Sequence, residues 1–315
     1  WKEYDAIAQT KCAKNYIREA DDENPFVLFL SWGPPHAPYQ TAPDEYKKMY
    51  TPEDISLRPN VPENNITKNP GYQSQVNQEQ VREDIAGYYA HISALDCCIG
   101  ELNDTIKDKG IEDNTIFIYT SDHGDLLGSH GAYKKQRPYE ESIKVPFLLR
   151  YPDAFGKNER EIDKPINAPD IMPTLLGLCG VSIPDSVEGI NYTPFLKGEE
   201  ELEKEEVLIE CIHPFGQWYK EVGGREYRGL RTRKYTYVKG LNGPWLLFDN
   251  EKDPYQMNNL INNSEYKDLQ EELDSRLQKK LEQRGDQFLP GEKYIEKWGY
   301  ETDDTGTVPY SNKLK

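Results

Sequence analysis

The chain has 315 residues, of which 38 are Lys or Arg and 55 are Asp or Glu, which gives a net charge of −17. Nucleic-acid backbones and anionic membranes both bind to concentrated basic surfaces, so this charge balance argues against either as a partner. No apolar run approaches the roughly 18 residues that a membrane helix needs, and we therefore expect no membrane span. The five cysteines, two of them adjacent at Cys97 and Cys98, do not indicate a regular disulfide framework.

The first part of the chain alternates between helical and strand-like patterns. The polar segment up to Asn24 indicates a helix or its approach, and the Pro- and Asn-rich residues 40–80 indicate a long surface excursion. Short apolar runs predict buried strands at 26–32, 115–121 and 145–151, and periodic apolar positions predict helices at 81–109 and 167–180. This order is typical of an α/β fold with a mostly parallel sheet flanked by helices.

The second part of the chain has a different pattern. The charge run at 197–206 is typical of a solvated linker, and we place a domain boundary near residue 200, giving domains 1–200 and 201–315. Beyond the linker we expect a small antiparallel sheet and an amphipathic helix: strands at 207–212, 227–230, 235–239 and 245–248, and a helix at 265–284.

Of the five histidines, His91 lies inside the long predicted helix, where we expect a structural role. His36 and His123 each come just after a predicted strand. Ligands of open α/β sheets bind beyond the carboxyl ends of the strands, so both positions are suited to a functional site. His36 lies between prolines, which restrict the loop and help to orient its imidazole.

Two further patterns point to chemistry. Asp122 and His123, followed by Gly124, can reach one cation from a single loop, although the same residues also suit a plain turn beside a surface histidine. Lys135 lies in a Lys-Lys-x-Arg cluster that could hold an oxyanion, although solvated lysines are the simpler reading.

In combination, five segments resemble the middle and C-terminal parts of type I sulfatases, the formylglycine-dependent branch of the alkaline phosphatase superfamily. The resemblance runs from about residue 24 to residue 284, and its segments are PFVLFLSWGPPHAPY, YYAHISALDCCIGEL, TIFIYTSDHGDLLGSHG, KKQRPYEESIKVPFLLRYP and LFDNEKDPYQMNNL. It implies an alkaline-phosphatase-like α/β fold with a small C-terminal antiparallel sheet, and sulfate ester hydrolysis.

The resemblance also implies roles for four residues. His36 would contact the sulfate and protonate the leaving oxygen, and Lys135 would hold the ester oxygens. Asp122 and His123 would supply two ligands to a divalent cation, normally calcium. Imidazole suits transition metals better than calcium, so manganese and zinc stay open, and phosphonate and phosphodiester hydrolases of the superfamily also carry Asp-His here.

One expected element is absent from the chain. The family's formylglycine is made from Cys or Ser in a Cys/Ser-x-Pro-x-Arg motif, and none of the 315 residues forms one. The Asp pair that completes the metal site and the Gly-Lys-Trp-His block are missing too. We therefore expect these elements to precede Trp1. The chain would then be a C-terminal fragment without turnover that binds metal poorly.

Some residues are weaker candidates for the site. His213, Trp218 and Arg231 could border a substrate cleft, but an edge histidine, a packed tryptophan and a solvated arginine are the simpler readings. We expect Glu140 and Glu141 to help anchor the following strand, and we assign no role to His130.

Two other functions remain open at this point. The first is a phosphodiester or phosphonate ester hydrolase of the same superfamily, and the second is a non-catalytic module that binds sulfated glycans. The negative charge favours a sulfated mono- or oligosaccharide over a long polysulfated ligand. The resemblance implies a periplasmic or secreted protein.

Overall fold

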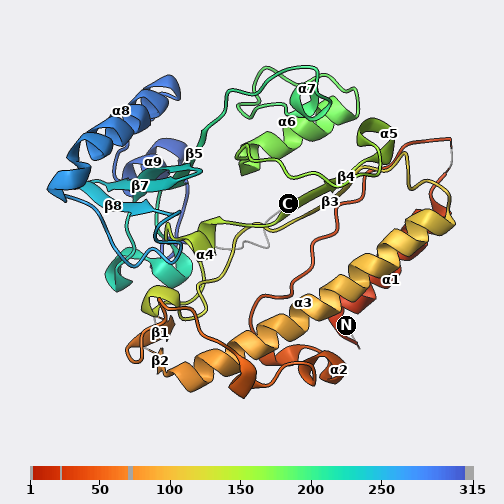
Figure 1. Ribbon diagram of the computed structural model, residues 1–315, viewed down its shortest axis with the longest axis horizontal. Coiled ribbons are helices and arrows are strands. Elements are labelled where there is room, and N and C mark those ends of the chain that lie inside the picture. The colour runs from red at the N-terminus through yellow and green to blue at the C-terminus, as the bar shows by residue number, and fades with distance from the viewer. Residues whose placement is uncertain (1–2, 22, 70–73, 309–315) are drawn as a thin grey trace. The chain divides into compact units, whose positions relative to one another are not determined.

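The computed structural model describes residues 3–21, 23–69 and 74–308 (Figure 1). These residues form two compact units, each assembled from separate stretches of the chain. Unit 1 takes the segments up to Ile66, Val76–Thr120 and Pro146–Asn158, and unit 2 takes Thr67–Gln75, Ser121–Val145 and the chain from Glu159 onward. The domain boundary that the sequence suggests near residue 200 stays a prediction.

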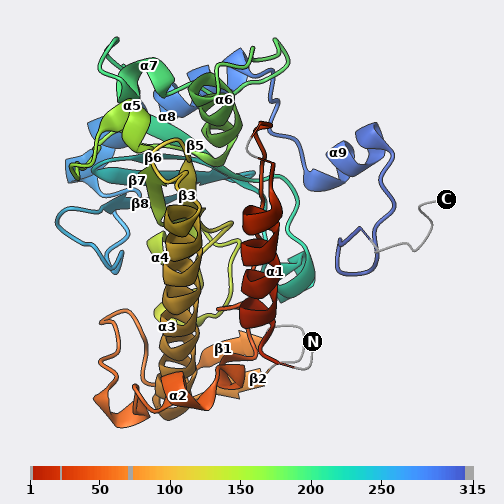
Figure 2. The ribbon, with the colours of Figure 1, turned by 90° about the vertical axis from the view of Figure 1, so that its right-hand side faces the viewer.

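Two helices form the core of unit 1. They are α1 (Asp5–Glu19) and α3 (Gln78–Asp108), which lie side by side (Figure 2). The Asn77 side chain accepts a hydrogen bond from the Gln80 backbone N–H at 3.0 Å and caps α3. Ala13 and Ile17 of α1 pack against Leu102 and Ile106 of α3, which confirms both predicted helices.

The predicted strand at 26–32 is not a strand in the structure. Phe26, Leu30 and Trp32 pack against α1 and α3, whereas Val27 and Phe29 are each 90% exposed. A strand needs a neighbour to complete its hydrogen-bond ladder, and no described strand pairs with this segment. The apolar run therefore corresponds to an extended segment that is buried on one side only.

The predicted parallel sheet is likewise not seen among the described residues. The strands β3 (Phe117–Thr120) and β4 (Phe147–Arg150) pair antiparallel, with Thr120 opposite Phe147. After Thr120 the chain enters a long loop and returns at the same end, where Thr120 Oγ1 donates to the Pro146 carbonyl at 2.9 Å. A parallel pair would require the chain to cross back to the opposite end before the second strand began.

The predicted surface excursion contains only short elements. Part of it is nevertheless packed, because Ile55 and Val61 are buried. The residue just before it, Tyr39, is also buried, and a Cβ at Gly87 of α3 would clash with the Tyr39 carbonyl. The remaining short elements in and near unit 1 are the 3₁₀ turns Tyr39–Thr41 and Pro52–Asp54, α2 (Asp44–Lys47), β1 (Ile66–Asn69), β2 (Ser74–Val76) and α5 (Pro152–Phe155).

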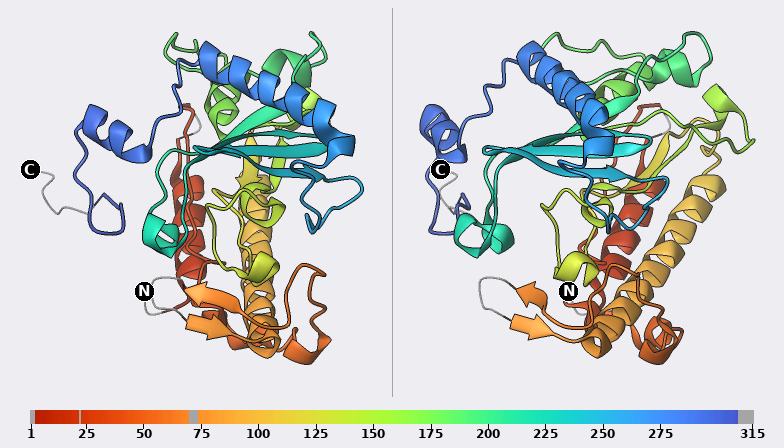
Figure 3. Two further views of the ribbon diagram at one scale, coloured as in Figure 1. Left: turned by 90° about the vertical axis from the view of Figure 1, so that its left-hand side faces the viewer. Right: turned by 60° about the vertical axis from the view of Figure 1, so that its left-hand side comes forward.

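Unit 2 contains the predicted antiparallel sheet and its helix. The four strands pair in chain order with α8 (Lys267–Gln283) on one face (Figure 3): β5 (Glu206–Cys211), β6 (Tyr227–Thr232), β7 (Tyr235–Gly240) and β8 (Gly243–Asp249). Leu273 and Leu277 of α8 pack on Leu247 of β8, whereas the flanking Leu246 and Phe248 point to the opposite face. That face packs against Trp218 and Tyr139.

The charge run at 197–206 is only partly a solvated linker. No helix or strand spans 198–205, but Lys204 forms an ion pair with Asp170, a buried residue of α6 (Ala168–Leu178). The other elements of unit 2 are α4 (Glu140–Ile143), α7 (Thr193–Leu196), α9 (Gly291–Trp298) and the 3₁₀ turns Ser129–Gly131, Gly216–Trp218, Lys220–Val222 and Ser264–Tyr266. In the described ranges, no helix is long and apolar enough to span a membrane. All five cysteines are free thiols.

A fully buried arginine connects β6 to the segment after α8. Arg228 Nε lies 2.5 Å from Asp286 Oδ2, and its guanidinium lies over the ring of Phe288 at 4.8 Å. Burial alone would raise the pKa of Asp286, but hydrogen bonds from Arg228 and Tyr294 lower it below its ordinary value. Arg228 and Asp286 therefore neutralise each other, whereas burying either charge alone would cost free energy.

We expect Asp286→Asn to lower the free energy of unfolding by about 3 kcal/mol, because buried Arg228 would lose its nearest counter-charge and keep only Glu210 at 3.6 Å. Denaturant unfolding followed by tryptophan emission measures the change. Asp185→Asn, at an exposed aspartate of the same unit, should leave the midpoint unchanged. Equal stability of the two variants would contradict the role given to the ion pair.

The same pair predicts a dependence of stability on pH. Because the folded-state pKa of Asp286 is lowered, its stabilisation is complete above the unfolded value of about 4 and is lost as the pH falls through the folded value. As the pH falls below about 4, the wild-type free energy of unfolding should therefore fall more steeply than that of Asp286→Asn. Parallel slopes would show that Asp286 does not carry this effect.

Candidate active site

His36 lies in unit 1 on a tight turn after the extended segment 26–32. Its backbone N–H donates to the Gly33 carbonyl at 3.2 Å, and its ring Nδ1 lies 2.8 Å from the Ala37 carbonyl. A carbonyl oxygen only accepts hydrogen bonds, so Nδ1 carries the proton in that contact. The ring is exposed, and its Nε2 is directed away from the backbone contact. His36 is thus available to a ligand.

Asp122 and His123 lie in unit 2, at the start of the loop that follows β3. His123 Nδ1 lies 2.8 Å from the Gly124 carbonyl, which places the proton on Nδ1 and leaves the lone pair on Nε2 of the neutral ring. That Nε2 lies 3.4 Å from Asp122 Oδ2. Two ligand atoms that share one divalent cation are separated by about 3–3.5 Å, given metal–ligand distances near 2.1 Å. These two side chains therefore suit a common cation.

Gly124 fixes the shape of the loop behind these two residues. Its N–H donates to the Ser142 carbonyl at 2.9 Å, and a Cβ at this position would clash with the Glu141 carbonyl. The glycine of the Asp-His-Gly segment is therefore required by a close approach between two backbone segments. Its neighbour Asp125 accepts hydrogen bonds from the backbone N–H groups of Leu127 and Lys134 at 3.1 and 2.8 Å.

Lys135 lies farther along the same loop and is half-buried. In the part of the chain that the structure describes, its ammonium has no ion-pair or hydrogen-bond partner. Arg137, two residues later, stacks over the Trp218 ring at 5.2 Å, and burial lowers its pKa from the ordinary value. The cluster thus presents an uncompensated cation at Lys135, which suits the binding of an oxyanion.

The loop is anchored on the C-terminal sheet within unit 2. Arg231 of β6 holds Glu140 with two hydrogen bonds, Nε to Oε1 at 2.6 Å and Nη2 to Oε2 at 2.8 Å. The Gln136 side chain exchanges two hydrogen bonds with the Phe215 backbone at 2.8 and 3.2 Å, and Tyr227 donates to the Gln136 carbonyl. These contacts hold the chain that follows Lys135.

The structure thus brings together two of the four predicted site residues. Asp122 and His123 meet at one point, and Lys135 lies on the same anchored loop. His36 belongs to the other unit, and the convergence of all four side chains on one ester stays a prediction.

Most of the weaker candidates are structural residues. Trp218 is buried in the sheet core, where it stacks with Trp245, and His91 is buried and hydrogen-bonded to Tyr4 and the Pro38 carbonyl. Arg231 is paired with Glu140 and is not the solvated side chain that the sequence suggested. Glu140 acts as an anchor, as predicted, but it holds the loop against Arg231 of β6 and not the strand that follows it.

His130 has a structural environment that the sequence did not reveal. Its ring stacks on Tyr139 with centroids 3.8 Å apart, and its Nε2 lies 3.9 Å from Glu141. Burial lowers the pKa of His130, although Glu141 opposes that shift. The stack supports the turn between His123 and Lys135. This role is visible only from the three-dimensional contact of His130 with Tyr139.

The Gly124 contact leads to a prediction. Gly124→Ala should lower the free energy of unfolding by about 1–3 kcal/mol, because the new methyl group would force the loop away from the Glu141 backbone. Hydrogen exchange of residues 121–145 should accelerate. Gly100→Ala in α3, where a Cβ meets nothing, is the matched control and should not destabilise the protein. Unchanged exchange in Gly124→Ala would show that the contact does not fix the loop.

Comparison with known proteins shows the family to which the chain is similar. Residues 2–181 match the sulfatase family model, and residues 128–283 match the C-terminal model of N-sulphoglucosamine sulphohydrolase. The chain is 38% identical to an ulvan-active sulfatase of Formosa agariphila over 95% of its length, and 31% identical to an endo-4-O-sulfatase of Bacteroides thetaiotaomicron over 82%.

These matches cover 56% and 53% of the two relatives, so the chain spans about half the length of the curated relatives that it matches. A solved structure in complex with its substrate D-glucosamine-2-N,6-O-disulfate has the same fold, with a TM-score of 0.75, 21% identity, and coverage of 91% of this chain and 71% of that one. The chain belongs to the sulfatase family of the alkaline phosphatase superfamily.

Proposed function

We propose that the intact protein hydrolyses a sulfate ester on a carbohydrate, with this chain supplying part of the catalytic site. The observation that supports the proposal most directly is the pair of ligand atoms Asp122 Oδ2 and His123 Nε2, 3.4 Å apart on a loop that also carries Lys135. The family match and the sulfated sugar bound to a structural relative support the class of substrate.

Each residue has a role that its environment suits. Asp122 and His123 would hold a divalent cation, which supplies positive charge beside the ester oxygens. Lys135 binds a non-bridging oxygen through its unpaired ammonium. His36 donates a proton from Nε2 to the departing oxygen while its Nδ1–H stays on the Ala37 carbonyl.

The two ligand atoms leave the choice of metal open between calcium and a transition metal. Calcium is the family's usual ion and prefers oxygen ligands, as Asp122 supplies. The Nε2 lone pair of His123 suits manganese or zinc better. We propose calcium as the resident ion, with manganese or zinc as the alternatives.

The proposed nucleophile lies outside these 315 residues. No Cys or Ser of the chain stands in a Cys/Ser-x-Pro-x-Arg motif, and a formylglycine from such a motif would supply the nucleophilic oxygen. The chain by itself should therefore show no turnover. We further propose a sulfated mono- or oligosaccharide substrate, because the net charge of −17 disfavours a long polysulfated ligand, and a periplasmic or secreted location.

The site assignment is tested in the intact protein. Lys135→Ala and His36→Ala should each lower kcat/KM on a sulfated sugar at least about tenfold, or roughly 1.4 kcal/mol of transition-state stabilisation. Lys134→Ala is the matched control, because its backbone shapes the loop while its side chain has no proposed role. Near-normal activity of either site variant, or a larger loss in Lys134→Ala, would contradict the placement.

A panel of esters separates this function from its alternatives. The intact protein should hydrolyse sulfated saccharides faster than matched phosphate diesters or phosphonate esters. The reverse order would indicate the related phosphoester hydrolases. Binding of sulfated glycans without hydrolysis of any ester would indicate a non-catalytic module.

A further inference from the structure

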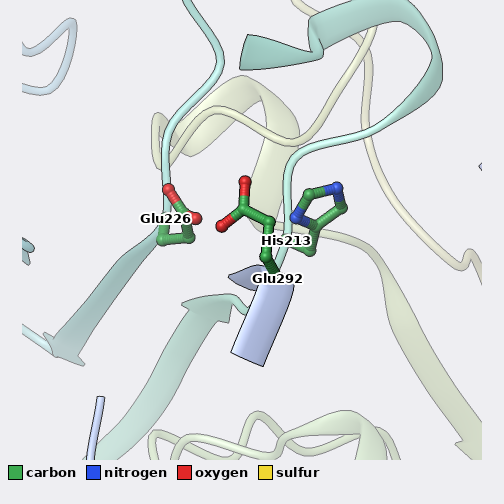
Figure 4. Close-up of side chains that lie close together, drawn as sticks. All are labelled: His213, Glu226 and Glu292. Atoms are coloured by element: carbon green, nitrogen blue, oxygen red, sulfur yellow. The ribbon is translucent and has the colours of Figure 1, made fainter. Parts of the chain in front are cut away.

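Three side chains that can bind metal gather in unit 2, away from the loop described above. His213 follows β5, Glu226 immediately precedes β6, and Glu292 lies in the first turn of α9. Figure 4 shows the imidazole and the two carboxylates directed toward one another. One ligand atom from each residue lies within 4.8 Å of the other two. Three separate segments thus converge on one point.

The imidazole nitrogen that faces this cluster lacks a partner. His213 Nδ1 is buried, and no described group forms a hydrogen bond with it. Buried polar atoms are normally satisfied, so an unpartnered nitrogen points to a ligand. Gly291 keeps the approach open, because a Cβ there would clash with Nδ1.

A cation already lies between the carboxylates of Glu226 and Glu292. The Lys220 ammonium lies 2.7 Å from Glu226 and 2.5 Å from Glu292, and the Glu226 side chain is only 4% exposed. Glu226 Oε1 also accepts a hydrogen bond from the Gly291 N–H at 2.8 Å. The site therefore combines oxygens from two carboxylates with an imidazole nitrogen.

We propose that His213, Glu226 and Glu292 form a binding site for a divalent transition-metal ion of the zinc class, distinct from the catalytic site. The ion binds Nδ1 of His213 and one oxygen from each carboxylate, and the Lys220 ammonium moves to solvent. Three protein ligands of this kind leave a fourth position for water. The carboxylate of Glu292, which is 57% exposed, makes the small movement that brings the ligand atoms to bonding distance.

The site would act as a structural clamp. It joins the connection between β5 and β6 to α9, which already contacts this region through the Lys220–Glu292 ion pair and the hydrogen bond from the Gly291 N–H to Glu226. Because the ion binds only the folded arrangement, zinc should raise the stability of the segment around α9. This effect needs no ester hydrolysis, so it is measured independently of activity.

The experiment uses zinc alone as the probe. The intact protein carrying Asp122→Asn and His123→Asn is freed of metal with a chelator and titrated with ZnCl₂ by calorimetry, with bound zinc counted by elemental analysis. We expect one equivalent of zinc to bind and α9 to gain protection from proteolysis. The two substitutions remove two of the ligands proposed for the catalytic site and so weaken zinc binding there, and the ligand variants described next assign the bound zinc to the new site.

Matched variants in that background identify the ligands. Glu292→Gln should weaken zinc binding at least about tenfold, whereas Glu296→Gln, one turn later on the exposed side of α9, should change it less than about twofold. Lys220→Met should tighten binding, because it removes the competing cation. Absence of zinc uptake, or equal affinity of Glu292→Gln and Glu296→Gln, would overturn the proposal.

Discussion

The geometry of the candidate site depends on the ion pair between Arg231 and Glu140. Residues 121–145 contain four non-glycine residues with left-handed backbone, Leu127, His130, Lys134 and Gln136, each of which costs about 1 kcal/mol or more. Such a loop keeps its shape only when its surroundings hold it. The two hydrogen bonds from Arg231, the paired hydrogen bonds between Gln136 and Phe215, and the hydrogen bond from Tyr227 provide that hold.

The C-terminal sheet therefore supports the loop of the candidate site even though its strands carry no predicted catalytic residue. One face packs on the leucines of α8, and the other packs on Tyr139 and Trp218, which contact His130 and Arg137 of the loop. Arg228 and Asp286 add a buried charge pair that holds the following segment against β6. These contacts fix the backbone near Lys135. Its ammonium can therefore stay without an ion-pair partner among the described residues, although the protein is acidic.

Local patterns predicted local structure well. The 3.6-residue periodicity located α3 and α8, and short strand-like segments with tight connections located β5 to β8, because both patterns depend on neighbours close in the chain. The failures depend on partners far away. Residues 26–32 have the composition of a strand but no strand to pair with, and the pairing of β3 with β4 depends on where the loop returns. Arg231 looked solvated because Glu140 is 91 residues away in sequence. The site residues were predicted from the resemblance to a family, and composition alone would not have identified them.

The two histidines predicted to act on the ester or its cation share one local arrangement. In both His36 and His123 the ring Nδ1 lies 2.8 Å from the carbonyl of the next residue, which fixes the tautomer and presents Nε2 outward. The arrangement needs only a tight turn, which Pro35 provides beside His36 and Gly124 provides beside His123. His91 is instead buried and His130 is half-buried, and burial lowers the pKa of both, which favours the neutral ring. The contact of Nδ1 with the next carbonyl therefore distinguishes His36 and His123, for which we propose proton transfer and metal binding, from His91 and His130, which support the fold.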